Sequence, residues 1–334
     1  MSADASIEYL GLRLAHPIVV GASPIGDRLD SARRCEDAGA AALTLRSLFA
    51  EQIAAEQMAA DRYLGGSDHV EAQRGYLPGT IDGKLGPDAW LEQIRKLRAA
   101  LGIPVIASLN GTTAGPWVEH AKLAEQAGAH AIELNLYALP SNPDLGAAAV
   151  EERLLEVVRA VRAQTKLPLS VKLSPFLSAP VAFVRALERA GADGVVLFNR
   201  FYQADIDVDA LELVRVLHLS DPGELLLRLR WLALVSPTTK LSLACSGGVH
   251  GGLDVARAVM SGAHAVQTVS AVLARGPTAL TAMIARYKAF LEEREYESSA
   301  QLCGSMNRAR CPDPEHWERA DYAQLLASWH GAVA

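Results

Sequence analysis

The chain has 334 residues, 50% of them apolar, and a formal net charge of −6. That is ample apolar material for one large core. Lys and Arg form no cluster beyond pairs, and no run of about eighteen residues is apolar, which argues against nucleic acid or an anionic membrane as a partner and against a membrane-spanning helix.

In chain order, the first predicted element is a β-hairpin over residues 7–15, where IEYLGLRLA alternates apolar and polar positions and turns at Gly11. Two alternating series of apolar strands follow. One series begins each time at a helix end and a small Gly-Ala turn, over residues 36–47, 125–137, 188–200 and 260–271. The other lies between them, over residues 16–23, 103–110, 167–174 and 240–248. Such runs are typical of parallel strands covered on both faces, and their alternation predicts eight of them.

Helical patterns fill the segments between strands, over residues 30–39, 87–102, 116–128, 148–164, 179–191, 252–262 and 277–295. Alternating strands and helices with right-handed crossovers indicate an α/β fold, and eight units in about 250–280 residues are the size of one (β/α)8 TIM barrel. A doubly wound open sheet is disfavoured because GASPIG at 21–26 does not match G-x-G-x-x-G. We place the N-terminal hairpin across the bottom of the barrel.

Residues 1–295 form one predicted domain, the barrel, and residues 296–334 a polar C-terminal extension, or tail, that packs on it. The N-terminal MSADAS resembles neither a signal peptide nor a transit peptide. The cysteines lack the spacing of a metal site and form no disulfide framework. We therefore expect a cytoplasmic protein that binds no metal.

Polar side chains stand where the predicted strands end: Ser23, Arg46, Ser47, Ser108, Asn110, Asn135, Lys172, Ser174, Asn199, Arg200, Ser246 and Ser270. Each alone is readily explained as a solvated loop residue. Because the strands of a barrel end at one rim, the set predicts a polar mouth on an apolar barrel, which is the usual shape of a ligand site.

The glycines after the seventh strand, Gly247 and Gly248, and the turn at Val269 and Ser270 after the eighth predict a phosphate site, with a simple tight turn as the alternative. Lys172 ends the fifth strand inside this mouth. A buried lysine requires an anion or an electron-rich ring, and a flavin fits this requirement. The alternative is an ion pair with Glu133 on the neighbouring strand.

Three motifs occur in the order of the strands: ELNL at 133–136, VKLSP at 171–175 and SGGV at 246–249. Over residues 7–295 the chain resembles the dihydroorotate dehydrogenase family. The resemblance implies an FMN-binding (β/α)8 barrel, with Lys172 as a flavin-contacting and catalytic residue. The cofactor-binding residues that it implies are Ala22, Ser23, Arg46 (where the family has lysine), Asn110, Asn135, Lys172, Asn199, Gly247, Gly248, Val269 and Ser270. Asn135 and Asn199 are expected to contact the substrate as well.

The chain departs from the family pattern at the proton-accepting base, a Cys or Ser three residues after the fourth-strand asparagine. Counting from Asn135 leads to Ala138, which cannot accept a proton. Two extra residues in the loop would instead bring Ser141 and Asn142 to this region, so Ser141 is the candidate base and Asn142 a substrate contact. Tyr137 is an alternative acid.

The sixth-strand motif also differs, because Asn199 is followed by Arg200. We expect Arg200 either to bind a substrate carboxylate or to belong to a pocket remodelled for another molecule.

These features predict an FMN-dependent oxidoreductase that transfers hydride between the CH–CH group of a small ring substrate and flavin N5, as in pyrimidine biosynthesis. The alternative is a flavin-binding accessory protein without dihydroorotate dehydrogenase activity. A weaker alternative is a flavin-free barrel acting on a sugar phosphate. Expected partners are a small-molecule substrate, a redox partner protein and a second copy of the chain in a homodimer.

Overall fold

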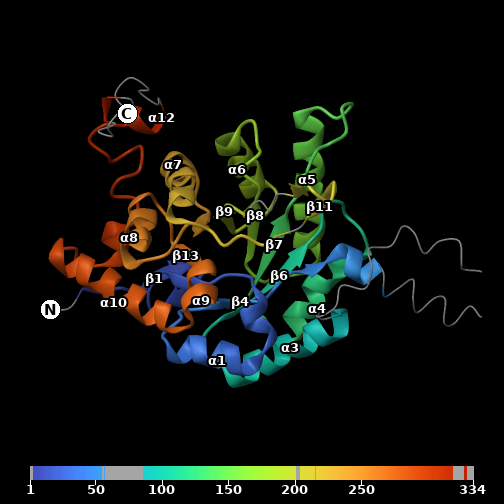
Figure 1. Ribbon diagram of the computed structural model, residues 1–334, viewed down its shortest axis with the longest axis horizontal. Coiled ribbons are helices and arrows are strands. Elements are labelled where there is room, and N and C mark those ends of the chain that lie inside the picture. The colour runs from blue at the N-terminus through green and yellow to red at the C-terminus, as the bar shows by residue number, and fades with distance from the viewer. Residues whose placement is uncertain are drawn as a thin grey trace, which may run out of the picture.

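The computed structural model describes residues 3–54, 56, 86–200, 204–214, 216–318 and 327–328. Its centre is a closed barrel of parallel strands surrounded by helices (Figure 1). The order around the barrel is β4-β3-β13-β12-β9-β8-β7-β6-β5, and pairing of β4 with β6 closes the ring. The predicted (β/α)8 TIM barrel is confirmed.

The strands are short, and most of their side chains are buried. They are β3 (Ile18–Val20), β4 (Leu43–Thr44), β5 (Leu48–Phe49), β6 (Val105–Asn110), β7 (Ala131–Leu136), β8 (Leu169–Leu173), β9 (Gly194–Leu197), β12 (Ser242–Ser246) and β13 (Ala265–Thr268). Both β4 and β5 pair with β6, so together they occupy the second position of the barrel.

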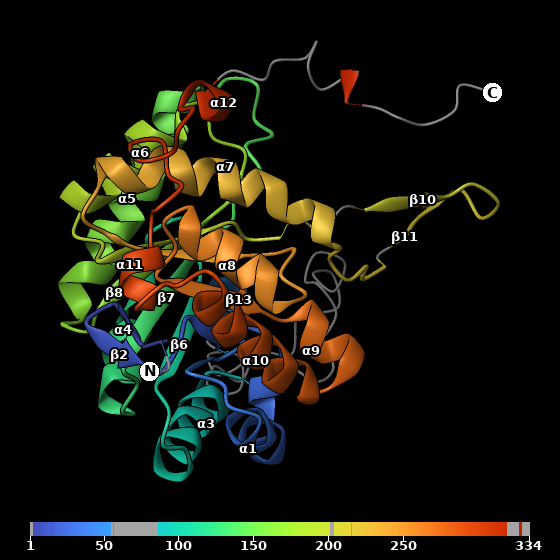
Figure 2. The same cartoon turned by 90° about the vertical axis from the view of Figure 1, so that its left-hand side faces the viewer.

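The helices lie on the outside of the barrel (Figure 2). They are α1 (Leu29–Asp37), α3 (Pro87–Ala100), α4 (His120–Gln126), α5 (Ala147–Gln164), α6 (Pro180–Arg189), α7 (Leu225–Val235), α8 (Gly252–Met260), α9 (Ser270–Arg275) and α10 (Thr278–Glu293). The sequence patterns do not predict α7. Its sequence LLLRLRWLALV is apolar on nearly every side, so it lacks the periodic polar face by which surface helices are recognised.

The N-terminal hairpin, β1 (Ile7–Tyr9) and β2 (Leu12–Leu14), covers the end of the barrel where the strands begin, as predicted. Tyr9 and Leu10 join a buried cluster with inward-facing strand residues such as Ile106 and Val196. The Leu10 N–H donates to Ser242 Oγ at 3.0 Å. A Cβ at Gly194 would lie 2.7 Å from Leu10 Cδ2, so glycine is required where the hairpin enters the barrel.

The repeated Glu-x-Ala-Gly motif has a structural role at this same end. Glu36, Glu125 and Glu188 each lie in the last turn of a helix and accept hydrogen bonds from the loop before a later strand. The acceptor distances are 2.6 Å from Gly102 N, 3.0 Å from Lys166 N and 2.9 Å from Thr239 Oγ1. The glycine of each motif has φ between 95° and 98°, a left-handed conformation that favours glycine.

The segment after α10 contains α11 (Ser299–Leu302) and α12 (Glu315–Glu318). Ser299 Oγ donates to the Ala5 carbonyl at 2.8 Å, and Met306 N donates to the Met260 carbonyl at 2.9 Å. This segment therefore contacts both the N-terminal residues and α8, while the division of the chain at residue 295 stays a prediction.

A second hairpin, β10 (Asp205–Asp207) and β11 (Glu212–Val214), follows β9 and projects from the barrel (Figure 2).

Candidate functional site

Three predicted site residues lie side by side on neighbouring strands at the mouth of the barrel. Asn110 of β6 pairs in register with Asn135 of β7, and Asn135 pairs with Lys172 of β8. All three are buried. Asn199, two residues after the end of β9, donates from Nδ2 to Asn135 Oδ1 at 3.1 Å. The structure thus brings together the side-chain amides of Asn110, Asn135 and Asn199 and the ammonium group of Lys172.

A buried polar network lies beneath this row. Lys172 Nζ donates to Glu133 Oε1 at 3.3 Å and to Gln267 Oε1 at 2.8 Å. Gln267 Nε2 in turn donates to Glu133 Oε2, which closes a ring of three side chains. Because β13 is not adjacent to β7 or β8, Gln267 reaches the other two across the interior of the barrel. The ion pair considered from the sequence is therefore present, and it uses two of the three ammonium hydrogens.

Tyr9 brings the N-terminal hairpin close to this network. Burial, followed by the negative charge of Glu133, raises the pKa of the Tyr9 phenol above its ordinary value. The phenol therefore stays neutral, and the only charges in this network are those of Glu133 and Lys172. The network is electrically balanced, which is the condition under which buried charges are tolerated.

The turn after β12 is formed by Gly247 and Gly248, with φ of 100° and 76°. Among the residues that the structure describes, neither glycine N–H has a hydrogen-bond acceptor. A Cβ at Gly248 would lie 2.3 Å from the backbone nitrogen of Leu225. Glycine is thus required here both for a tight turn and for close packing, and the turn still leaves two backbone donors.

The other predicted cofactor residues lie around the same mouth. Ser23 follows β3 and is buried, and its hydroxyl has no partner among the described residues. Ala22, beside it, is half-buried. Arg46 forms an ion pair with Asp27 at 2.8 Å. Val269 precedes α9, and Ser270 Oγ accepts from Ser220 N at 3.0 Å.

Ser141, the predicted base, lies on an exposed loop. Ser141 and Asn142 are exposed on the loop between β7 and α5. Ser141 N donates to the Leu139 carbonyl at 2.9 Å, and Asn142 Oδ1 accepts from Asp144 N at 2.9 Å. These are bonds within the loop itself. The structure does not bring Ser141 to the row formed by Asn110, Asn135 and Lys172.

Arg200 forms an ion pair with Glu224 at 3.1 Å, and Glu224 also pairs with Arg228 of α7 at 3.5 Å. Sequence reasoning missed Gln267, Glu224 and Arg228. Gln267 was detectable as the polar residue in the apolar run HAVQTV. No sequence pattern pointed to Glu224 and Arg228, because only folding brings α7 to the turn at Gly247 and Gly248.

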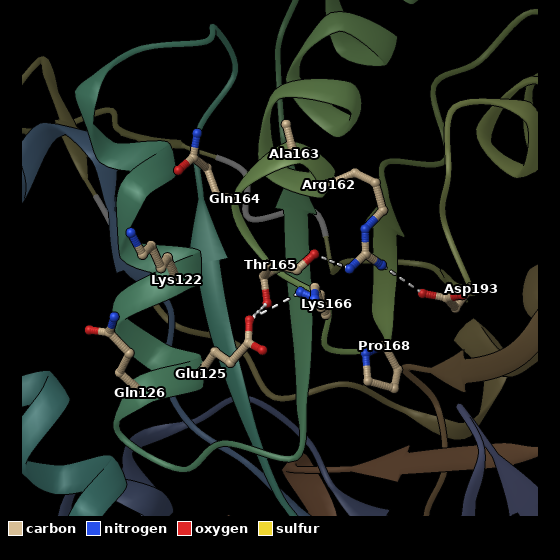
Figure 3. A pocket seen from close by; sticks show the side chains of 10 residues that line it. All are labelled: Lys122, Glu125, Gln126, Arg162, Ala163, Gln164, Thr165, Lys166, Pro168 and Asp193. Atoms are coloured by element: carbon tan, nitrogen blue, oxygen red, sulfur yellow. Dashed lines mark hydrogen bonds and ion pairs between the residues drawn. The ribbon is translucent and has the colours of Figure 1, made fainter.

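A pocket lies at the opposite end of the barrel, where β8 and β9 begin (Figure 3). It is lined by Lys122, Glu125, Gln126, Arg162, Ala163, Gln164, Thr165, Lys166, Pro168 and Asp193. Its polar groups are largely engaged with one another: Glu125 accepts from Thr165 and Lys166, and Arg162 pairs with Asp193 at 3.1 Å. It is separate from the row of predicted site residues.

A family model described as dihydroorotate dehydrogenase matches residues 83–291 of the 334. The chain belongs to the dihydroorotate dehydrogenase family. The names of the family's members indicate that this chain is a dihydroorotate dehydrogenase-like oxidoreductase. The match includes β6 to β13, the strands that carry most of the site.

Curated relatives agree with this membership. The chain is 28% identical over 317 residues to a putative dihydroorotate dehydrogenase A (fumarate) of Aeropyrum pernix, which covers 92% of this chain and 98% of the relative. It is 32% identical over 212 residues to the catalytic subunit of dihydroorotate dehydrogenase B (NAD(+)) of Anoxybacillus flavithermus, covering 62% and 67%. The corresponding subunit of Citrifermentans bemidjiense is 31% identical over 248 residues, covering 71% and 79%.

Within this dihydroorotate dehydrogenase-like chain, the described residues contain no helix that is both long and apolar enough to cross a membrane.

Proposed function

We propose that this protein is an FMN-dependent oxidoreductase that transfers hydride between the CH–CH group of a small ring substrate and flavin N5. The observation that carries the proposal is the row of Asn110, Asn135 and Lys172 at the barrel mouth, near a glycine turn whose two backbone N–H groups have no acceptor in the described part of the chain. Family membership supports the same chemistry.

The residues present fit FMN in two respects. The N–H groups of Gly247 and Gly248 are donors suited to a phosphate. Lys172 has one ammonium hydrogen beyond those used by Glu133 and Gln267, and a cation is the group that stabilises a reduced, anionic flavin ring. We assign Gly247, Gly248, Val269 and Ser270 to the phosphate. Ala22, Ser23, Arg46, Asn110, Asn135, Lys172 and Asn199 are assigned to the rest of the cofactor.

When bound, FMN supplies hydride transfer at N5. This chain's residues then have to hold and orient the substrate and handle its proton. Asn135 and Asn199, joined by their mutual hydrogen bond, are proposed to orient the substrate ring. Arg200 and Asn142 stay proposed substrate contacts, and Arg200 would have to exchange its contact with Glu224 for a substrate carboxylate.

One observation favours a second candidate function, a flavin-binding accessory protein with little dihydroorotate dehydrogenase activity. Counting from Asn135 without a gap leads to Ala138 at the position of the family's base, and the candidate Ser141 is exposed on its loop. Removal of a general base typically lowers a rate by about two to four orders of magnitude. We therefore expect FMN binding with slow turnover of dihydroorotate.

Two measurements test these proposals. Absorbance of the purified protein at the flavin bands, with FMN released on denaturation, tests cofactor binding. A colourless protein that fails to bind added FMN contradicts both candidates and leaves the sugar-phosphate barrel. Anaerobic mixing of the yellow protein with dihydroorotate then separates the two candidates. Rapid bleaching supports the oxidoreductase, whereas bound FMN that stays oxidised supports the accessory role.

The names of two relatives refer to a catalytic subunit, which supports a redox partner protein for this chain as a proposal. A homodimer, a cytoplasmic location and a place in pyrimidine biosynthesis are proposed on the same family basis.

A further inference from the structure

Arg228 of α7 lies directly against the glycine turn after β12. A Cβ at Gly247 would be 2.8 Å from Arg228 Nη2 and 3.0 Å from Nε, so the guanidinium occupies the space beside this glycine. Arg228 Nε donates to the Ser246 carbonyl at 3.0 Å, and Nη1 donates to the Glu224 carbonyl at 2.7 Å. These two bonds attach the turn to the beginning of α7.

The guanidinium is deeply buried, with 5% of Arg228 exposed. Burial lowers the pKa of Arg228, and Glu224 opposes this shift. An arginine nevertheless remains protonated in proteins. Within the described ranges, Glu224 is the carboxylate that pairs with it, and Glu224 also pairs with Arg200. The single carboxylate of Glu224 is thus divided between two guanidinium groups.

The Arg228 guanidinium lies beside the turn whose two backbone N–H groups have no acceptor among the described residues. A buried charge acts over several ångströms because little water screens it. The glycine turn alone offers only neutral donors, whose bonds to an anion are strengthened by a nearby cation.

We propose that Arg228 is a specificity-determining residue that makes the barrel prefer a phosphorylated flavin, with Glu224 limiting the strength of that preference. This inference rests on the proposed function. It goes further because it assigns recognition of the phosphate dianion to a charge cluster on α7 and on the loop after β9. Arg228 acts through the turn that it supports and is a positioning residue in this sense.

The experiment compares FMN with riboflavin, which has the same ring and lacks the phosphate. Each flavin is titrated into the flavin-free, full-length protein and followed by quenching of flavin fluorescence. For Arg228→Gln we expect the affinity ratio of FMN to riboflavin to fall roughly tenfold, because the variant removes a charge that only the phosphate senses. For Glu224→Gln we expect the ratio to rise.

Arg162→Gln is the matched control, because Arg162 is an ion-paired arginine at the opposite end of the barrel. It should leave the ratio unchanged. A merely structural role of Arg228 would weaken both flavins equally, and an unchanged ratio overturns the inference. If Arg228→Gln does not fold, Glu224→Gln decides alone, since a ratio that stays constant or falls contradicts the proposal. Failure of the parent protein to bind either flavin would instead contradict the proposed function.

Discussion

At the residue scale, Lys172 has two roles that need not compete. Its ion pair with Glu133 and its bond to Gln267 hold the ammonium group within the barrel, and one hydrogen remains for a ligand at the mouth. A lysine bound only to a cofactor would be an unpaired buried charge whenever the cofactor is absent. The network explains how the flavin-free chain tolerates this lysine.

We expect Lys172→Ala to weaken FMN retention, because it removes the cation proposed to face the flavin ring. The measurement is the dissociation constant for FMN by fluorescence titration. Lys166→Ala, which replaces an exposed lysine at the other end of the barrel, is the control. Equal FMN affinity in the Lys172 variant and the parent would show that the assignment of Lys172 is wrong.

Glu133→Gln should lower the free energy of unfolding by about 3–5 kcal/mol, because removal of one partner of a buried ion pair leaves the other uncompensated. The double variant Glu133→Gln with Lys172→Met should recover much of this loss. Urea denaturation of the flavin-free protein measures the double variant and each of its two single variants. A double variant as unstable as the sum of the single ones would contradict the pairing.

Ser141→Ala tests the proposed base directly. Since Ser141 is exposed and, among the described residues, is bonded within its own loop, we expect residual turnover with dihydroorotate to stay within about twofold of the parent. A fall of about a hundredfold or more would restore Ser141 as the base and would require the loop to move toward the mouth on substrate binding.

At the element scale, the repeated Glu-x-Ala-Gly motifs stabilise the end of the barrel that lies away from the site. His16 belongs to the same end. Its Nε2–H donates to the Gly39 carbonyl at 2.7 Å, and its Nδ1 accepts from Ile18 N at 3.2 Å. A second proton on Nδ1 would face the Ile18 N–H, and burial lowers the pKa of His16 from 6.5 to about 4.

This shift predicts a pH dependence of stability. The unfolded chain binds the proton more tightly, so the contribution of His16 is complete above about pH 6.5 and is lost as the pH falls toward 4. The loss over this window is about 3 kcal/mol. In His16→Gln we expect the free energy of unfolding to fall less steeply between these pH values. The exposed His218→Gln is the control, and equal slopes in parent and His16 variant would contradict the prediction.

At the scale of the whole molecule, the projecting hairpin exposes an apolar face. Ile206 and Leu213 are cross-strand neighbours with 63% and 75% of their surface exposed, and Leu211 at the turn is 85% exposed. A two-stranded hairpin with an uncovered apolar face is marginal by itself in water. If the proposed homodimer forms, this face is where we expect the second copy to pack.

Accordingly, Leu213→Glu should convert the dimer to a monomer in sedimentation velocity, because it places a charge in the apolar contact. Leu253→Glu, on the exposed side of α8, should leave the molar mass unchanged. A parent protein that is already monomeric, or a Leu213 variant that remains dimeric, would show that this face does not hold the dimer together.

The sequence by itself determined the barrel and most of the row at its mouth. Strand periodicity and the Gly-Ala turns are local signals, and parallel strands necessarily bring their ends to one rim, so Asn110, Asn135 and Lys172 could be placed without coordinates. Only the tertiary structure decided which groups meet across the interior. Gln267 closes the ring with Glu133 and Lys172 from a distant strand, and Arg228 reaches Gly247 from a helix with no periodic pattern. Such contacts depend on how the closed ring of strands and its outer helices set side chains opposite one another, and no local pattern in the chain records that arrangement.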